Sequence, residues 1–143
     1  MTHKTLICLA ILILSQDAYA NDCLPTAHRT TGTHYEPVTQ QKINISNGLT
    51  VKGKVLAMPE CQPVAHAKVA HWQAGEDGHY QDRLRAYLFT DAQGNYQFET
   101  EWPNISPPHI HFIISADGYQ VLETQWIGSQ RSEVINFNMV LEQ

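Results

Sequence analysis

The chain lacks the features that mark membrane-spanning and nucleic-acid-binding proteins. It has no run of about 18 apolar residues, the length that crosses a bilayer as a helix. Its 9 Lys and Arg residues are outnumbered by 14 Asp and Glu residues, which gives a formal net charge of −5, and they form no cluster. This charge pattern offers no electrostatic footprint for nucleic acid or an anionic membrane. We therefore expect no nucleic-acid partner and no membrane span in the mature protein.

Cysteine is also scarce, and its positions are informative. Of three cysteines, Cys8 lies in an N-terminal segment with the pattern of a secretory signal peptide, so Cys23 and Cys61 remain in the mature chain. An even pair in an oxidising compartment predicts a disulfide. A metal site that uses both thiolates is the alternative, but the two cysteines lack the close spacing of zinc-binding pairs.

The signal peptide is predicted over residues 1–20. Lys4 provides a short positive region, residues 6–14 form an apolar stretch too short to span a bilayer, and Ala18-Tyr19-Ala20 matches a small-x-small cleavage site. We expect cleavage after Ala20 and a single exported domain over residues 21–143, located in the periplasm or outside the cell. An uncleaved N-terminal anchor is the alternative.

The chain also lacks a helical stripe of useful length. Instead, apolar and polar residues alternate over many short segments separated by Gly, Pro and Asn turns, a pattern that predicts an all-β, antiparallel β-sandwich. Residues 21–36 show no periodicity, so we expect an N-terminal arm or loop before the sandwich. The predicted strands cover residues 49–56, 67–72, 85–90, 95–100, 109–115, 119–126 and 134–141.

Two histidines stand two residues apart in one predicted strand, in the sequence Pro108-His109-Ile110-His111-Phe112. Residues i and i+2 of a strand point to the same face, with Cα atoms roughly 6–7 Å apart. Both imidazoles could therefore bind one metal ion. Two hydrogen-bonded core histidines are the alternative, because a His-x-His pair by itself is not specific.

Short motifs follow one another in a specific order along the mature chain. They are Val51-x-Gly53-x-Val55, Cys61-x-Pro63, Ala67-x-Val69-x-x-Trp72-Gln73-Ala74, Gly78-x-Tyr80, Leu84-Arg85, Thr90-Asp91-x-x-Gly94-x-Tyr96-x-Phe98-x-Thr100, Pro107-x-His109-Ile110-His111-Phe112 and Thr124-Gln125. Single motifs are weak signals, but the ordered set is specific. It resembles that of the intradiol ring-cleavage dioxygenases, especially their small secreted relatives.

The resemblance implies a non-haem Fe(III) centre that acts on a catechol or a related aromatic diol with O2. Carried over by motif, the metal ligands are Tyr80, His109 and His111. Phenolates are hard anionic donors that suit ferric iron, and imidazoles complete the shell. Tyr80 is thus implied to be catalytic, together with Gln125, which matches a glutamine next to the ligands. Trp72 matches a tryptophan that packs behind the site.

The chain also departs from the family pattern. A second tyrosine ligand normally lies in a longer loop after the predicted strand 95–100, but here residues 101–106 contain no tyrosine. Ser106 stands where the family has an arginine. His34, Tyr35 and Tyr87 are candidates for a fourth ligand, although a packing or rim position suits each of them better.

Two functional hypotheses follow from the sequence. In the first, the protein is an exported intradiol dioxygenase whose activity is weakened by the missing tyrosine and arginine. In the second, it is a non-catalytic β-sandwich module for binding or accessory roles that keeps only a partial metal site. The retained tyrosine and histidines favour the first hypothesis, and the two losses favour the second.

Overall fold

The computed structural model describes residues 23–143, which form nine β-strands. The predicted signal peptide, residues 1–20, lies outside the described residues. Within residues 23–143, no helix has the length and apolar character needed to cross a bilayer.

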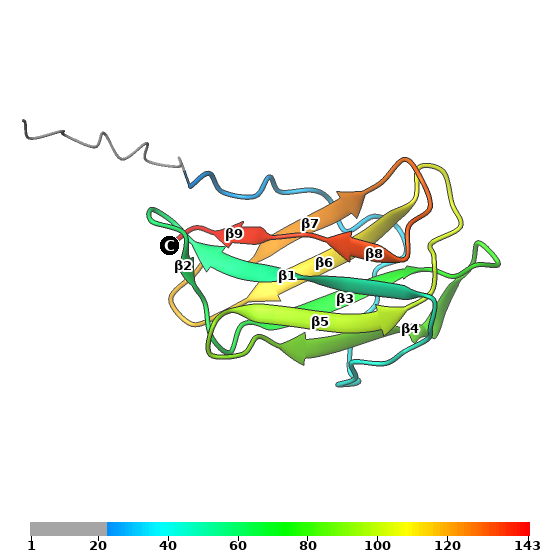
Figure 1. Ribbon diagram of the computed structural model, residues 1–143, viewed down its shortest axis with the longest axis horizontal. Coiled ribbons are helices and arrows are strands. Elements are labelled where there is room, and N and C mark those ends of the chain that lie inside the picture. The colour runs from blue at the N-terminus through cyan, green and yellow to red at the C-terminus, as the bar shows by residue number, and fades with distance from the viewer. Residues whose placement is uncertain (1–22) are drawn as a thin grey trace, which may run out of the picture.

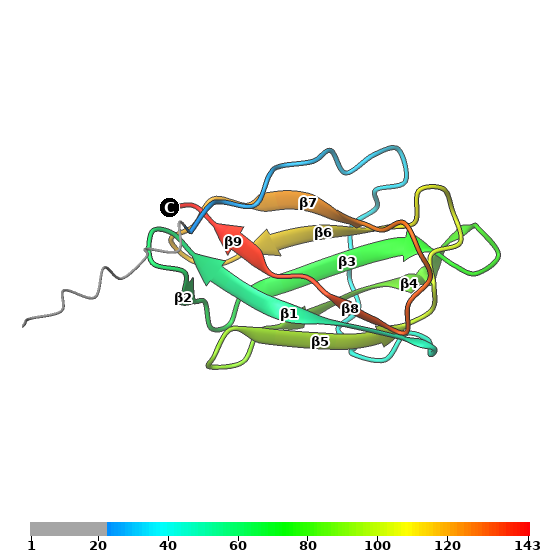
Figure 2. The ribbon, with the colours of Figure 1, turned by 45° about the horizontal axis from the view of Figure 1, so that its top comes forward.

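The strands form two sheets that lie face to face, as Figures 1 and 2 show. The first sheet contains β1 (Leu49–Ala57), β2 (Gln62–Pro63), β5 (Asn95–Thr100), β8 (Val134–Asn136) and β9 (Met139–Leu141). The second sheet, in the order β4-β3-β6-β7, contains β4 (Tyr80–Phe89), β3 (Lys68–Ala74), β6 (His109–Ser115) and β7 (Leu122–Ile127). The predicted β-sandwich is therefore confirmed.

Apolar residues from both sheets fill the space between them. Alternation along the strands supplies this core because successive side chains of a strand point to opposite faces. Phe98 of β5 and Phe112 of β6, for example, are almost fully buried, with ring centroids 6.3 Å apart. The other face of the second sheet is thus left for polar and aromatic side chains.

The last predicted strand, 134–141, differs from the structure in two ways. It is split into β8 and β9, and both pair with β1 in parallel rather than antiparallel. The split occurs beside Gly53, where a Cβ atom would lie 2.0 Å from the Phe137 carbonyl oxygen. At that point the side chain of Asn138, rather than a backbone carbonyl, accepts the hydrogen bond from the Lys54 N–H. A side-chain partner of this kind leaves no periodic signal in the sequence.

Strand β4 starts five residues earlier than predicted, and its pairing with β3 is irregular. Trp72 pairs with Arg85, but Ala74 pairs with Tyr80. Regular antiparallel pairing would place Arg83 opposite Ala74 instead. The shift in register therefore brings Tyr80 to the end of the sheet, next to β3.

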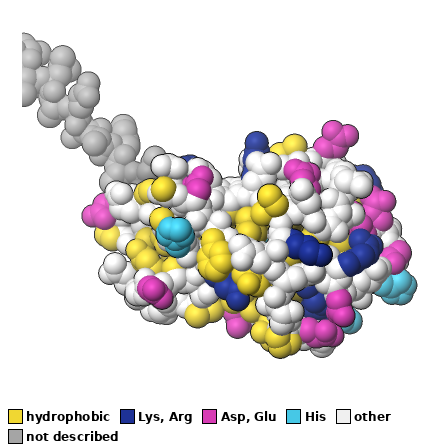
Figure 3. Space-filling view, turned by 90° about the horizontal axis from the view of Figure 1, so that it is seen from below, with side chains coloured by type: hydrophobic (Ala, Val, Ile, Leu, Met, Phe, Trp, Pro, Cys, Tyr) yellow, Lys and Arg dark blue, Asp and Glu magenta, His cyan; other side chains and the backbone are white. Residues whose placement is uncertain are grey.

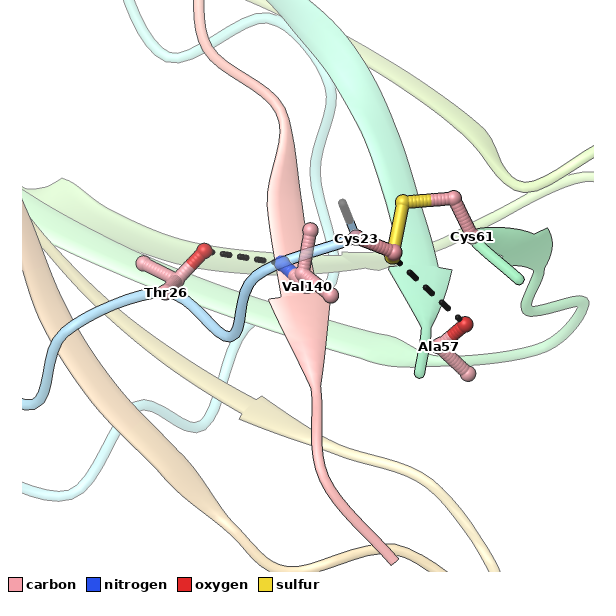
Figure 4. Close-up of a disulfide and its surroundings, with 5 residues drawn as sticks. All are labelled: Cys23, Thr26, Ala57, Cys61 and Val140. Carbon is pink, nitrogen blue, oxygen red and sulfur yellow. Dashed lines mark hydrogen bonds between the residues drawn. A yellow bond between two sulfur atoms is a disulfide. The ribbon is translucent and has the colours of Figure 1, made fainter. Parts of the chain in front are cut away.

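The N-terminal arm (residues 23–48) crosses the outer face of the second sheet, as expected for an ordered arm (Figure 2). Its start is fixed by the predicted Cys23–Cys61 disulfide, which the structure contains with a Cα–Cα distance of 5.4 Å (Figure 4). Thr26 follows, and exchanges two hydrogen bonds with the backbone of Val140. The arm is thus bonded to the C-terminal strand before it reaches the second sheet.

The exposed surface mixes charges of both signs. On the face that Figure 3 shows, acidic and basic side chains are interspersed, with apolar side chains between them. That face therefore carries no continuous basic patch.

His71 is an ionisable group within the core. Its ring stacks on Phe98, with centroids 3.6 Å apart, and neither ring nitrogen has a hydrogen-bond partner among the described residues. Because successive side chains of a strand point to opposite faces, His71 faces away from Trp72 and lies against the opposite sheet. Complete burial lowers the pKa of His71 to about 3 because the charged form would lose its hydration.

We predict that His71 makes the fold sensitive to acid. Between about pH 6.5 and pH 3 the unfolded state binds a proton that the folded state excludes, so the free energy of unfolding falls as the pH falls, by up to about 1.4 kcal/mol per pH unit. In a His71→Leu variant this part of the decline should vanish. Urea unfolding at pH 7, 6, 5 and 4 measures it, with exposed His28→Asn as the control. Parallel pH profiles for wild type and His71→Leu would contradict the prediction.

We also predict that the disulfide contributes substantially to stability. It closes a loop of 38 residues, and restricting the unfolded chain in this way is worth about 3–4 kcal/mol. A Cys23→Ser/Cys61→Ser variant should lose about that amount in urea unfolding. Mass spectrometry of unreduced peptides provides the direct check, and two free thiols in exported protein would refute the pairing.

Candidate functional site

Four side chains from four strands line up across the outer face of the second sheet. Cross-strand pairing places Arg85 opposite Trp72, Trp72 opposite His111, and His111 opposite Gln125. Directly opposite residues of antiparallel strands have Cβ atoms about 4.5–5.5 Å apart. The sheet therefore holds the predicted histidine, tryptophan and glutamine in one row, and adds an arginine to it.

Tyr80 and His109 converge on His111, within this row. The Tyr80 hydroxyl oxygen lies 3.1 Å from Nε2 of His109 and 3.1 Å from Nε2 of His111. The two histidines share one face of β6, as predicted from their spacing, and the irregular pairing of β4 supplies the tyrosine. The structure thus brings the three predicted ligands together, while their role in binding a metal stays a prediction.

This donor set fits a metal ion. Ligands bound at about 2.1 Å and at right angles to each other lie about 3.0 Å apart, close to the observed separations. Within residues 23–143, no group of three or more His, Cys, Asp or Glu side chains is arranged to hold a metal. A metal at this point therefore needs the phenol oxygen of Tyr80.

The surroundings of the two imidazoles suit metal binding. His109 donates its Nδ1 hydrogen to the Pro107 carbonyl oxygen at 2.9 Å, which leaves the Nε2 lone pair directed at Tyr80. Such a bond on the far nitrogen is the usual way in which proteins orient a ligating histidine. His111 is held by Trp72, whose indole stacks on it with centroids 5.0 Å apart and planes 5° apart.

Burial determines which protonation state each side chain of the site adopts. It lowers the pKa of His111 to about 4, and positive charge on His109, His34 and Arg85 lowers this pKa further. The imidazole of His111 is therefore neutral at pH 7, as a metal ligand must be. Burial raises the pKa of the Tyr80 phenol, and the nearby Arg85 guanidinium partly opposes that rise. A bound cation would be needed to hold Tyr80 as phenolate near neutral pH.

The arm covers the row and is bonded to both of its ends. At one end, Gln125 donates from its side-chain amide to the Thr30 carbonyl oxygen at 2.7 Å. At the other end, Arg85 donates from Nη1 to the His34 carbonyl oxygen at 2.8 Å. Gln125 therefore lies beside the histidines, as predicted, and it also anchors the arm above them.

Arg85 is the residue of the site whose role was not anticipated. It formed part of the motif order, but an isolated Leu-Arg pair in a strand carries no signal for a buried cation. The structure buries its side chain on the outer face, where Nε has no hydrogen-bond partner among the described residues and lies 3.8 Å from the exposed Asp82 carboxylate. Its positive charge acts on both Tyr80 and His111.

The segment that lacks the second tyrosine packs against the loop before Tyr80. Glu101 accepts two hydrogen bonds from Arg83, one from Ser46 and one from the Glu76 N–H. Arg83 holds the pKa of this carboxyl at about 2, well below its usual range. The short segment 101–106 is thus fixed in place without contributing a phenol.

No family model matches the chain. Among curated proteins, it is 33% identical to the hydroxyquinol 1,2-dioxygenase of Rhodococcus opacus over 90 residues, an alignment that covers 43% of this chain and 30% of that protein. It is 30% identical to catechol 1,2-dioxygenase 2 of Acinetobacter lwoffii over 106 residues, which covers 54% of this chain and 38% of that protein. The chain therefore spans about a third of the length of these relatives.

Among solved structures, the dioxygenase domain of a dioxygenase–carbohydrate-binding protein fusion from Streptomyces sp. SirexAA-E has the same fold. The TM-score is 0.74 at 24% identity, over 82% of this chain and 98% of that domain. An intradiol ring-cleavage dioxygenase of Tetranychus urticae gives a TM-score of 0.66 at 25% identity, over 72% of this chain and 64% of that one. These proteins are catechol, hydroxyquinol and intradiol ring-cleavage dioxygenases, so the resemblance predicted from the motifs is confirmed.

We predict that Arg85 keeps the arm closed over the site. An Arg85→Met variant keeps much of the apolar stem but loses the hydrogen bond to His34, and a hydrogen bond from a charged donor is worth about 1.5–3 kcal/mol. Cleavage of the arm by chymotrypsin after the exposed Tyr35 should then be faster by about tenfold or more. Limited proteolysis followed by mass spectrometry measures this, with the exposed Arg29→Met as control. Unchanged cleavage after Tyr35 would exclude this role.

Proposed function

We propose that this protein is an exported, non-haem iron member of the intradiol ring-cleavage dioxygenases that binds a catechol or a related aromatic diol and opens its ring with O2. The observation that carries the proposal is the convergence of the Tyr80 hydroxyl with two imidazole nitrogens, each at 3.1 Å. Similarity to catechol and hydroxyquinol 1,2-dioxygenases supports the substrate class.

Each residue has a distinct part in this proposal. A ferric ion held by Tyr80, His109 and His111 would supply the chelation that activates a diol towards O2. His109 is oriented by its bond to Pro107, so its Nε2 lone pair is available without rearrangement. Trp72 covers the buried side of His111 and excludes water from it. A site assembled in advance in this way avoids reorganisation when substrate binds.

We propose further that the rate of ring opening is low. The second tyrosine of the family pattern accepts a proton from the diol, and the arginine supports negative charge on the ring. Neither residue is present, and Ser106 is too short and uncharged to replace the arginine. Loss of one well-placed charge-stabilising donor costs roughly 10²–10³ in rate. Binding of the diol should persist, because chelation needs only open positions on the metal.

A non-catalytic binding module is the second candidate. It is favoured by the segment 101–106, which lacks tyrosine and is held by Glu101 and by the Asn104 side chain, which donates to the Glu76 carbonyl oxygen. A rigid segment of this kind does not bring another group to the metal. The two candidates differ in whether the bound diol reacts with O2.

Ferric loading distinguishes the ligands from their neighbours. Wild-type protein with Fe(III) should show a visible phenolate-to-metal charge-transfer band that shifts when catechol is added. Tyr80→Phe should lose the band, whereas Tyr87→Phe, on the same strand, should keep it. His109→Ala should fail to load metal, whereas the exposed His79→Ala should load normally. A band that survives in Tyr80→Phe would contradict the assignment of Tyr80.

Activity is tested by oxygen uptake and product analysis. Intradiol cleavage consumes one O2 per ring and places both oxygen atoms in a dicarboxylic acid. We expect kcat at least about 10²-fold below the ordinary enzyme median of about 10 s⁻¹. A kcat near that median would show that other groups replace the missing tyrosine and arginine. Binding of the diol without any ring opening would favour the non-catalytic module.

A further inference from the structure

The three proposed ligands leave part of the coordination shell open. Tyr80 comes from β4, and His109 and His111 come from β6, so all three donors are supplied by the sheet. Iron sites with only three protein ligands on one face keep open positions opposite them. In this fold, the chain that lies above the sheet is the N-terminal arm.

Residues 32–34 of the arm lie next to two of the three donors, His111 and Tyr80. A Cβ atom added to Gly32 would be 3.6 Å from Cε1 of His111. The next-but-one residue, His34, stacks its imidazole on the Tyr80 ring, with centroids 4.4 Å apart and planes 11° apart. The backbone there is fixed by the hydrogen bond from Arg85 to the His34 carbonyl oxygen. The His34 side chain is therefore tethered beside the site.

The imidazole of His34 is not committed to another partner. The side chain is exposed, and neither ring nitrogen makes a hydrogen bond to the described residues. Its charge is close enough to lower the pKa of His111. In the present arrangement it faces the Tyr80 ring rather than the two histidines, so ligation requires the ring to turn. Because the His34 side chain is exposed, the turn breaks its stacking on Tyr80 but does not disturb the core.

The other candidates for a fourth ligand are engaged elsewhere. The ring of Tyr35 meets Trp72 edge-on, with centroids 5.4 Å apart. The ring of Tyr87 packs against Phe89 and lies under the ammonium group of Lys68, which is 4.2 Å from its centroid. The ring that stacks on Tyr80 is that of His34. His34 is thus the candidate that reaches the site.

We propose that His34 is a fourth metal ligand, supplied by the arm in place of the tyrosine that the segment 101–106 lacks. The inference rests on the proposed metal site. It gives the centre three neutral imidazoles and one phenolate, so the protein contributes a single negative charge instead of two. Such a shell favours the ferric state less strongly and also accepts divalent ions that bind imidazole well.

The test separates ligation from stacking. His34→Phe keeps an aromatic ring on Tyr80 but cannot bind metal, His34→Ala removes both, and His28→Ala is an exposed histidine control on the same arm. Affinity is measured by calorimetric titration of the mature wild-type and variant proteins with Co²⁺. X-ray absorption of the loaded proteins counts imidazole ligands, and urea unfolding of the apoproteins confirms that each variant folds.

We expect His34→Phe and His34→Ala to weaken Co²⁺ binding alike, by at least tenfold to a hundredfold, the loss typical of removing even an outer partner of a ligand. X-ray absorption should show three imidazoles in wild type and two in His34→Phe. Wild-type affinity in His34→Phe, with or without a loss in His34→Ala, would overturn the assignment while leaving the three-ligand site intact. Failure of wild-type protein to bind Co²⁺ and Fe(III) would overturn both this inference and the proposed function.

Discussion

The register between β3 and its two neighbours is the constraint on which the site depends. Side chains alternate between the two faces of a strand, so a slip of one residue would turn His111 into the core and expose Phe112. The correct register is secured because Phe112, Ile110 and Ile114 are fully buried on the inner face. Packing of the hydrophobic core on the inner face thus determines which side chains form the row on the outer face.

One irregularity in that register is equally important. Between Trp72 and Ala74 the pairing with β4 shifts, and Tyr80 rather than Arg83 comes to lie opposite Ala74. Ala74 is fully buried and has the smallest side chain that still carries a Cβ atom, so it leaves room beside it for the tyrosine ring. Bulges of this type commonly re-aim a side chain next to a functional site. Here it delivers the one anionic donor of the proposed metal centre.

The histidines of the chain show how position alone separates structural from chemical roles. His71 and His111 lie on adjacent strands and are both buried. His71 faces the core, where neither ring nitrogen has a hydrogen-bond partner among the described residues and burial lowers its pKa to about 3. His111 faces outwards, where the Tyr80 hydroxyl lies 3.1 Å from its Nε2 atom. Composition cannot make this distinction, but the alternation of Trp72 with His71 along β3 does.

The sequence by itself determined the fold class, the two strands β5 and β6 to the residue, the disulfide, and the three side chains that converge. These features depend on local spacing, on alternation and on an ordered set of motifs, all of which can be read along the chain. The sequence did not determine the parallel pairing of β8 and β9 with β1, the early start of β4 or the burial of Arg85. Tertiary structure decided these, because each depends on a partner distant in sequence: Asn138 beside Lys54, Ala74 opposite Tyr80, and the His34 carbonyl above Arg85. The position of His34 over Tyr80 has the same origin, since an arm without periodicity is placed only by what it touches.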